Sequence, residues 1–393
     1  LPLTLLLMAV PHIMFPNSHI NRLDNLLPLV VPALAASDLM LAALAYRFDV
    51  ASTVRARAVI EPWTISIGAF ALAWTLPRDG LLVAYALSMG AAFIASLIPF
   101  LKTYGLPKNW SPRPHALWSL ARRNAPLAAA DAIEWGSRRL DLAILGLFVS
   151  PATVGIYWVA QQIASLPQKL KTSFDPVLGP VITRRLREGD RVAVSQQISK
   201  AGFWILAAQV GVALALGIPA HGLLGLVGPD SGFVGGTAAL GFLLFAEVVA
   251  ALGVVSEAAL VYIARHRNML LSLAMIGVQA VLSVIVLVIL HNDGAPETQM
   301  AAAVAGILCI ALALASATKS LLARRLLGAS VSVWRWPLLI AAVAALGVGQ
   351  IFIQLPEWVE LAFGIPAILA TYCWLIWKWA FREEDRVLFR RLK

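Results

Sequence analysis

Five charged side chains lie within eleven residues of an otherwise apolar stretch, DAIEWGSRRLDLAILG, at residues 131–146. Intervals of three and four residues place four of them on one face of a helix: Asp131, Glu134, Arg138 and Asp141. On that face Arg138 can pair with Glu134 and with Asp141. Arg139 points about 100° away from the others and needs a different partner.

The composition places these charges in a membrane protein. Of the 393 residues, 60% are hydrophobic and 13% are charged, and the mean hydropathy is +0.80. Soluble domains are nearer 45–50% apolar and about 25% charged. A net charge of +10 then indicates Lys and Arg in cytoplasmic loops rather than nucleic-acid binding.

A headgroup position explains only Asp131. The uncharged residues 142–149 would extend about 12 Å as a helix, whereas the hydrocarbon core is about 30 Å thick. Arg138, Arg139 and Asp141 are therefore expected at membrane depth. Each lipid-exposed charge there costs about 2.5–3.5 kcal/mol, so such residues usually face a water-filled cavity. A purely structural salt-bridge network is the alternative.

The next apolar segment, 152–180, also has a polar face. Four of its residues share that face: Gln162, Ser165, Lys169 and Thr172. With Lys171 and the two arginines, these residues predict a cationic site for an anionic ligand, and phosphate is the group that such side chains bind best. The alternative is that both lysines pair with Asp175 or with the acids of the preceding helix.

Three further acids fall within apolar segments: Asp38, Glu247 and Glu257. Carboxylates at such depth are candidate carriers of a proton or Na⁺, and counter-ions to buried cations are an equal alternative. There is no Walker A, HExxH or GxSxG motif and no Cys/His metal-ligand spacing. We therefore expect a protein that is not an enzyme and that uses no cofactor or metal.

Hydropathy predicts twelve membrane-spanning segments, at about 1–15, 26–45, 59–76, 80–101, 125–148, 152–180, 203–227, 233–263, 268–290, 298–322, 335–354 and 359–380. Basic loops alternate with short neutral or acidic loops along the whole chain. By the positive-inside rule the basic loops and the C-terminal tail, 381–393, are cytoplasmic. The expected fold class is thus an all-α polytopic membrane protein.

Several short motifs resemble one family of membrane proteins. Arg139 and Asp141 lead into Gly146 and Phe148, and Val-Gly-Ile-Tyr follows at residues 154–157. The stretch is similar to the seventh and eighth helices of bacterial polysaccharide (O-antigen and exopolysaccharide) flippases. These belong to the superfamily that also holds lipid II flippases and multidrug and toxic compound extrusion pumps.

The resemblance implies a fold of fourteen helices, of which the first two would precede Leu1. It implies two six-helix lobes around a central cavity, followed by two C-terminal helices. The corresponding boundaries are 1–101 for the rest of the N-terminal lobe, 102–124 for a cytoplasmic linker, 125–322 for the C-terminal lobe, 323–380 for the two extra helices and 381–393 for the tail.

The resemblance also implies a function in lipopolysaccharide or exopolysaccharide biosynthesis. Family members carry polyprenyl-diphosphate-linked oligosaccharide across the bacterial inner membrane by alternating access. Here Arg138, Arg139, Lys169, Lys171 and Gln162 would hold the diphosphate or an acidic sugar. Proton or Na⁺ coupling would fall to Asp141, Glu134 or Glu247, with Glu257 and Asp38 as further candidates. Polymerase and chain-length proteins are possible partners.

Two other functions remain open. A multidrug/cation antiporter of the same superfamily would need an acidic cavity, which the basic excess of 131–175 disfavours. A membrane glycan polymerase or ligase would usually need a large periplasmic loop with catalytic residues, and the predicted outer loops are short.

Overall fold

The computed structural model describes residues 2–10, 12, 14, 23–47, 49–76, 79–106, 111, 115–125, 139–172, 188, 191–228, 232–328 and 333–381. Within these ranges the regular secondary structure is entirely helical. The chain divides into two compact units, Leu1–Pro126 and Leu127–Lys393. In the described residues, seven helices are long and apolar enough to cross a membrane. The chain is an all-α polytopic membrane protein by these criteria.

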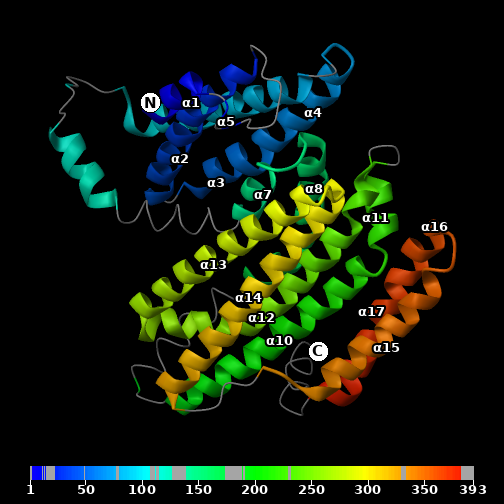
Figure 1. The fold of residues 1–393 in the computed structure, drawn as a ribbon. Helices are drawn as coiled ribbons and strands as arrows, with labels where there is room; N and C mark the ends of the chain where they lie inside the picture. The colour runs from blue at the N-terminus through cyan, green and yellow to red at the C-terminus, as the bar shows by residue number, and fades with distance from the viewer. Residues whose placement is uncertain are drawn as a thin grey trace. The chain divides into compact units, whose positions relative to one another are not determined.

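The first unit is built on a long helix that packs against two others. Its elements are α1 (Pro2–Ala9), η2 (Asp24–Leu29), α2 (Val30–Tyr46), α3 (Val50–Thr53), η3 (Val54–Ile60), α4 (Glu61–Ala73) and α5 (Gly80–Tyr104). Helix α5 packs against α2, α4 and η3 (Figure 1). The buried side chains of Leu41, Leu44 and Ala56 form the core of this unit.

In both units a π-helical segment precedes a proline. Elements α3, η3 and α4 form one continuous helix from Val50 to Ala73, and its π-helical part ends just before Glu61 and Pro62. Likewise η5 (Glu360–Gly364) directly precedes Ile365 and Pro366. A proline in a helix lacks an N–H donor and its ring collides with the carbonyl four residues earlier. The wider π turn makes room for the ring, so each helix continues through its proline.

Asp49 fixes the start of this continuous helix. Its carboxylate accepts hydrogen bonds from the Ser52 backbone N–H at 3.1 Å and from the Ser52 hydroxyl at 2.7 Å. This is the pattern of a helix N-cap. Both bonds lower the pKa of Asp49, and the bond from the Ser52 hydroxyl has the larger effect. The stability that these bonds add is fully present when the pH is above the ordinary pKa of the carboxyl. It is lost as the pH falls through the lowered pKa of Asp49 in the folded protein.

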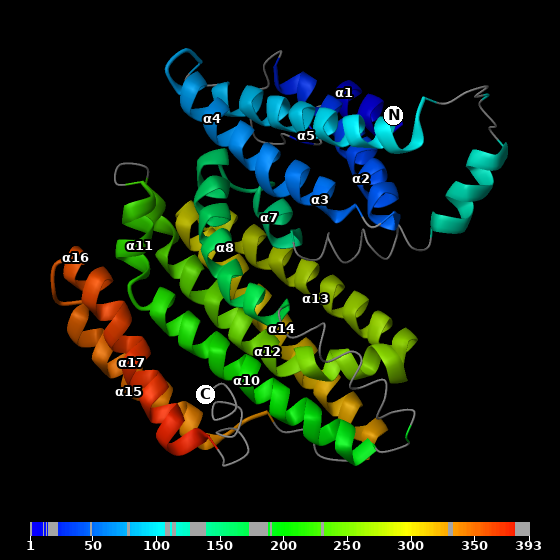
Figure 2. The same cartoon turned by 180° about the vertical axis from the view of Figure 1, so that it is seen from behind.

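The second unit contains the remaining helices. They are α7 (Leu140–Leu145), α8 (Pro151–Thr172), α10 (Arg191–Gly217), α11 (Ala220–Val227), η4 (Phe233–Gly236), α12 (Thr237–Ile263), α13 (Arg265–Asn292), α14 (Glu297–Leu327), α15 (Trp336–Phe352), α16 (Glu357–Val359), η5, α17 (Ile365–Leu375) and η6 (Ile376–Ala380). Helices α10, α12 and α14 run side by side, α13 lies along α14, and the α15–α17 hairpin lies along α10 (Figures 1 and 2).

Two apolar cores hold this unit together. One joins α7, α8, α12 and α14 around Leu145, Tyr157 and Leu240. The other joins α10 to α15 and α17 around Phe203, Ala341 and Tyr372. In contrast, α13 exposes large apolar side chains, among them Val281, Ile285 and Ile289. Such an apolar surface is suited to lipid contact.

The prediction of twelve spans exceeds the seven helices that meet the length and hydropathy criteria in the described residues. The other five predicted spans fall on shorter or more polar elements. Helix α1 has eight residues and α15 seventeen. Helix α4 has thirteen residues, and the segment that continues it toward the N-terminus carries Arg55 and Arg57. Most of the predicted span at 125–148 lies outside the described residues, and α7 covers six of the residues that are described. Helix α8 is long enough, with 22 residues, but carries several glutamines and lysines. The count of twelve stays a prediction.

Gly253 allows the close approach of α12 to α14. A Cβ at this position would lie 2.7 Å from Cα and Oγ of Ser316, and the backbone atom of α14 cannot move aside independently. At the same level the Ser316 hydroxyl donates to the Val249 carbonyl at 3.0 Å. The two helices are therefore joined by a hydrogen bond that only a residue without a side chain permits.

We expect Gly253→Ala to destabilise the protein by about 1–3 kcal/mol, because the added methyl overpacks the α12–α14 contact. Gly241 on the same helix is the matched control, since a Cβ there meets no atom within 4 Å. Gly241→Ala should instead stabilise by about 0.5–1 kcal/mol through the lower entropy of the unfolded chain. Thermal unfolding of both variants in detergent, followed by tryptophan fluorescence, measures the difference. Equal effects of both substitutions would contradict the close approach.

Candidate functional site

Part of the predicted cationic site lies outside the described residues. Asp131, Glu134 and Arg138 belong to that part, so their predicted pairing is not tested. The main chain of Lys169 and Lys171 lies in α8, and their side chains are outside the description. Arg139, Asp141 and Gln162 lie among the described residues.

Asp141 is buried where α7 packs against α8. Asp141 is only 1% exposed, and Tyr157, which binds it from α8, is fully buried. The Tyr157 hydroxyl donates to Oδ2 of Asp141 at 2.6 Å, and Nε2 of Gln161 donates to the same oxygen at 3.2 Å. Tyr157 and Gln161 are four residues apart, so they point from one face of α8. Hydrogen bonds to a charged group contribute about 1.5–3 kcal/mol each.

Arg139 joins this cluster through Gln161. Nη1 of Arg139 donates to Oε1 of Gln161 at 2.9 Å. The Arg139 residue is exposed, while the amide that it binds reaches inward to the buried Asp141. Arg139, Gln161, Asp141 and Tyr157 thus form one hydrogen-bonded chain, which we call the Asp141 network.

The sequence singled out Gln162, whereas the structure brings Gln161 to the network. Gln162 is exposed, and its carbonyl accepts a hydrogen bond from the Ser165 hydroxyl at 2.6 Å. One residue along a helix corresponds to about 100° of rotation. Tyr157 was also absent from the predicted site. Its spacing of four from Gln161 is a signal that could have identified both residues.

Two of the acids that were predicted to carry ions have cationic partners. In the first unit Nη1 of Arg57 donates to Glu61 at 2.7 Å, and Nη2 of Arg57 donates to Asp38. In the second unit Nζ of Lys319 lies 3.0 Å from Oε1 of Glu257. These pairs match the counter-ion alternative. The third acid, Glu247, is partly buried on α12.

A glutamate that the sequence did not suggest ties α14 to the start of α8. Glu297 accepts hydrogen bonds from the Ser150 backbone N–H at 3.1 Å, from the Ser150 hydroxyl at 2.5 Å and from the Thr153 hydroxyl. Ser150 directly precedes α8, and Thr153 lies in its first turn. The contact therefore stabilises the hairpin that carries the Asp141 network.

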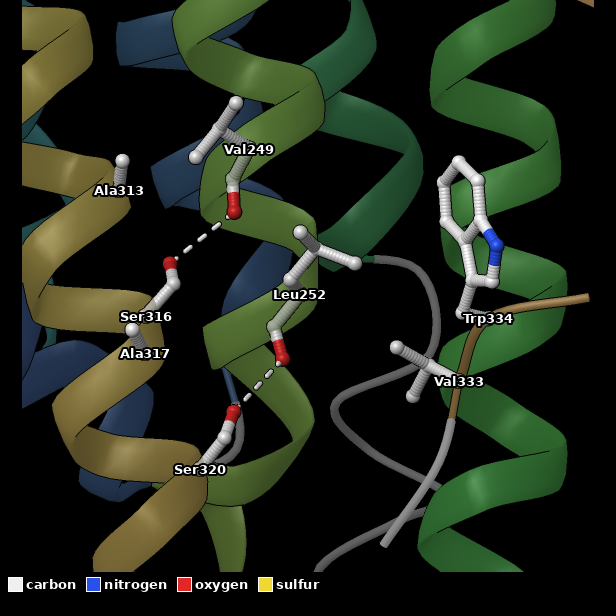
Figure 3. Close-up of a pocket in the computed structure, with 8 residues that line it drawn as sticks. All are labelled: Val249, Leu252, Ala313, Ser316, Ala317, Ser320, Val333 and Trp334. Atoms are coloured by element: carbon white, nitrogen blue, oxygen red, sulfur yellow. Dashed lines mark hydrogen bonds between the residues drawn. The ribbon is translucent and has the colours of Figure 1, made fainter. Parts of the chain in front are cut away.

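A cavity of about 310 Å³ lies between α12, α14 and residues 333–334. It is lined by Val249, Leu252, Ala313, Ser316, Ala317, Ser320, Val333 and Trp334 (Figure 3). The hydroxyls of Ser316 and Ser320 turn away to the carbonyls of Val249 and Leu252. The lining is otherwise apolar and includes no predicted site residue, so this cavity is unsuited to a charged ligand.

The described residues contain no group of three His, Cys, Asp or Glu side chains that could hold a metal ion. Comparison of the sequence with protein-family models and with curated proteins gives no match.

Removing Glu257 should destabilise the protein more than removing Lys319, with which it pairs. Lys319 has a side chain that is 11% exposed, against 38% for Glu257. Glu257→Ala leaves a buried ammonium without this acceptor and should cost about 1–3 kcal/mol. Lys319→Met leaves a carboxylate that water can reach and should cost less. We expect the double variant to resemble Lys319→Met in thermal unfolding; a double variant as unstable as the sum of both would contradict the pairing.

Proposed function

We propose that this protein is a flippase that carries polyprenyl-diphosphate-linked oligosaccharide across the bacterial inner membrane. The observation that carries the proposal is the position of Arg139. Arg139 is an exposed residue at the start of the α7–α8 hairpin, and its Nη1 donates to Oε1 of Gln161. The remaining N–H donors match the planar, paired oxygens of a phosphate group.

The pairing of the acids supports an anionic passenger. A multidrug antiporter needs carboxylates that can accept an organic cation. Asp38 and Glu257 already contact Arg57 and Lys319, and Asp141 is buried beneath Tyr157 and Gln161. A glycan polymerase or ligase remains the less favoured alternative because the predicted outer loops are short.

In this proposal each residue of the hairpin has a separate task. Arg139 contacts the diphosphate, and Gln161 fixes the direction of its guanidinium. Asp141 accepts a hydrogen bond from Gln161, and Tyr157 donates one to Asp141. Glu297 stabilises the turn between α7 and α8. Arg138, Lys169 and Lys171 would add to the positive charge around the ligand. Transport would proceed by alternating access, with the C-terminus in the cytoplasm and without a cofactor or enzymatic step.

Replacing Arg139 tests this function in cells. The gene is deleted in its host and replaced by variant copies, and the amount of surface polysaccharide is measured together with the protein level in the membrane. We expect Arg139→Ala to reduce surface polysaccharide at least about tenfold, a typical effect of losing a charged contact. Arg139→Lys should retain part of the activity because it keeps the charge but not the bidentate geometry.

Arg123→Ala is the matched control, since Arg123 is an exposed arginine in the helical segment at residues 115–125 of the first unit. It should transport like the unaltered protein. The expected loss in Arg139→Ala should be accompanied by lipid-linked oligosaccharide that accumulates in the inner membrane. If deletion of the gene leaves surface polysaccharide unchanged but increases sensitivity to cationic dyes, the antiporter function is correct instead.

A further inference from the structure

The side-chain amide of Gln161 bonds at both ends to ionisable residues. Its Nε2 donates to Asp141, at 3.2 Å from Oδ2 and 3.4 Å from Oδ1. Its Oε1 accepts from Arg139 at 2.9 Å. A carboxylate can only accept hydrogen bonds and a guanidinium can only donate them. The amide, with one acceptor and one donor group, is therefore held in a single orientation by its two neighbours.

A proton on Asp141 would reverse this arrangement. Oδ2 already accepts from Tyr157 at 2.6 Å and from Gln161 at 3.2 Å, so the carboxylic O–H would form at Oδ1, which lies 3.4 Å from Nε2 of Gln161. Because Asp141 is buried, this O–H needs an acceptor. Oε1 of Gln161 can serve if the amide turns over. The NH₂ group of Gln161 then faces the N–H groups of Arg139. Two donors cannot bond to each other, so Arg139 loses its hydrogen bond to Gln161.

We propose that Gln161 is a positioning residue that couples protonation of Asp141 to release of Arg139 for anion binding. When Asp141 is ionised, Gln161 holds Arg139; when Asp141 is protonated, Arg139 turns to an anion. Proton binding and anion binding are then positively linked, and each must strengthen the other by the same factor. This inference rests on the proposed function only in assigning a phosphate ligand to Arg139.

Other titratable groups on the surrounding helices could add their own pH dependence. Helix α7 packs against α13 and α14, and α8 against α10, α12 and α14. The titratable groups on the parts of these helices that share the core with the Asp141 network are Glu247, His291, Glu297 and Cys309. The His291 ring contacts Phe148, and Glu297 is bound by Ser150 and Thr153. His291→Gln therefore serves as a control.

The test measures how readily Arg139 reacts with phenylglyoxal, an arginine reagent, at one fixed pH. The full chain in detergent is labelled, and mass spectrometry gives the rate at Arg139. Asp141→Asn imitates the protonated acid, because its amide is neutral and can donate a hydrogen bond. Coupling between sites is commonly about 5- to 150-fold. We expect Asp141→Asn to raise the rate at least about fivefold and Gln161→Leu to raise it by a similar factor.

The double variant distinguishes coupling from independent effects. If Gln161 transmits the charge of Asp141, then Asp141→Asn should have no further effect in the Gln161→Leu background. Gln161→Glu should lower the rate below that of the unaltered protein, since a carboxylate holds Arg139 more firmly. Multiplicative effects of the two substitutions, or an unchanged rate in Asp141→Asn, would overturn the proposal. His291→Gln should leave all of these ratios unchanged.

Pyrophosphate binding by the same variants separates this inference from the proposed function. Pyrophosphate itself titrates, so the affinity of Asp141→Asn is divided by that of the unaltered protein at each pH. The titration of pyrophosphate affects both proteins equally and cancels in this ratio. We expect this ratio to approach one as the pH falls. If labelling shows the expected coupling but pyrophosphate neither binds nor protects Arg139, the coupling by Gln161 stands and the anionic ligand is wrong. If pyrophosphate protects Arg139 in every variant without coupling, the ligand class stands and the role of Gln161 is wrong.

Discussion

The described structure depends on one constraint, which is that a polar group removed from water needs a partner inside the protein. Apolar side chains fill the space between the helices, and hydrogen bonds from buried polar groups join particular pairs of them. Asp141 joins α7 to α8, Ser316 joins α14 to α12, and the Tyr372 hydroxyl joins α17 to the Ala207 carbonyl of α10 at 2.7 Å. Gly211 leaves room for the Tyr372 ring, because a Cβ there would lie 2.9 Å from it.

The same constraint distinguishes cations that are paired with carboxylates inside the protein from Arg139. Arg57 has two carboxylates and Lys319 has one, so their charges are neutralised within the described residues. Arg335 donates to the Ala380 carbonyl at 2.7 Å and lies over the Phe203 ring. Arg139 differs because the partner described for it is a neutral amide and because it is exposed. Among these cations, its charge is the one best placed for an external anion.

The sequence predicts the fold class well because hydropathy is a local property that requires no knowledge of packing. It also identifies Arg139 and Asp141, since charged residues in an apolar segment are conspicuous wherever they fold. It does not decide between Gln161 and Gln162, because their directions depend on how the turn at residues 146–150 rotates α8 against α7. The Glu297 contact spans nearly 150 residues and therefore depends on the tertiary packing. Residues 46–58 lie between two predicted spans, and the π-helical segment before Pro62 instead makes Arg57 part of a continuous helix.

A neutral amide between Asp141 and Arg139 has a different consequence from a direct ion pair. In a low-dielectric interior a direct Asp–Arg pair would be strong, and a phosphate would have to displace a carboxylate to reach the guanidinium. Gln161 keeps the two charges apart while still fixing the direction of Arg139. An anion then competes with an amide oxygen, which is the weaker acceptor. In the proposed function, this arrangement would orient the guanidinium before an anion binds and still allow the anion to be released.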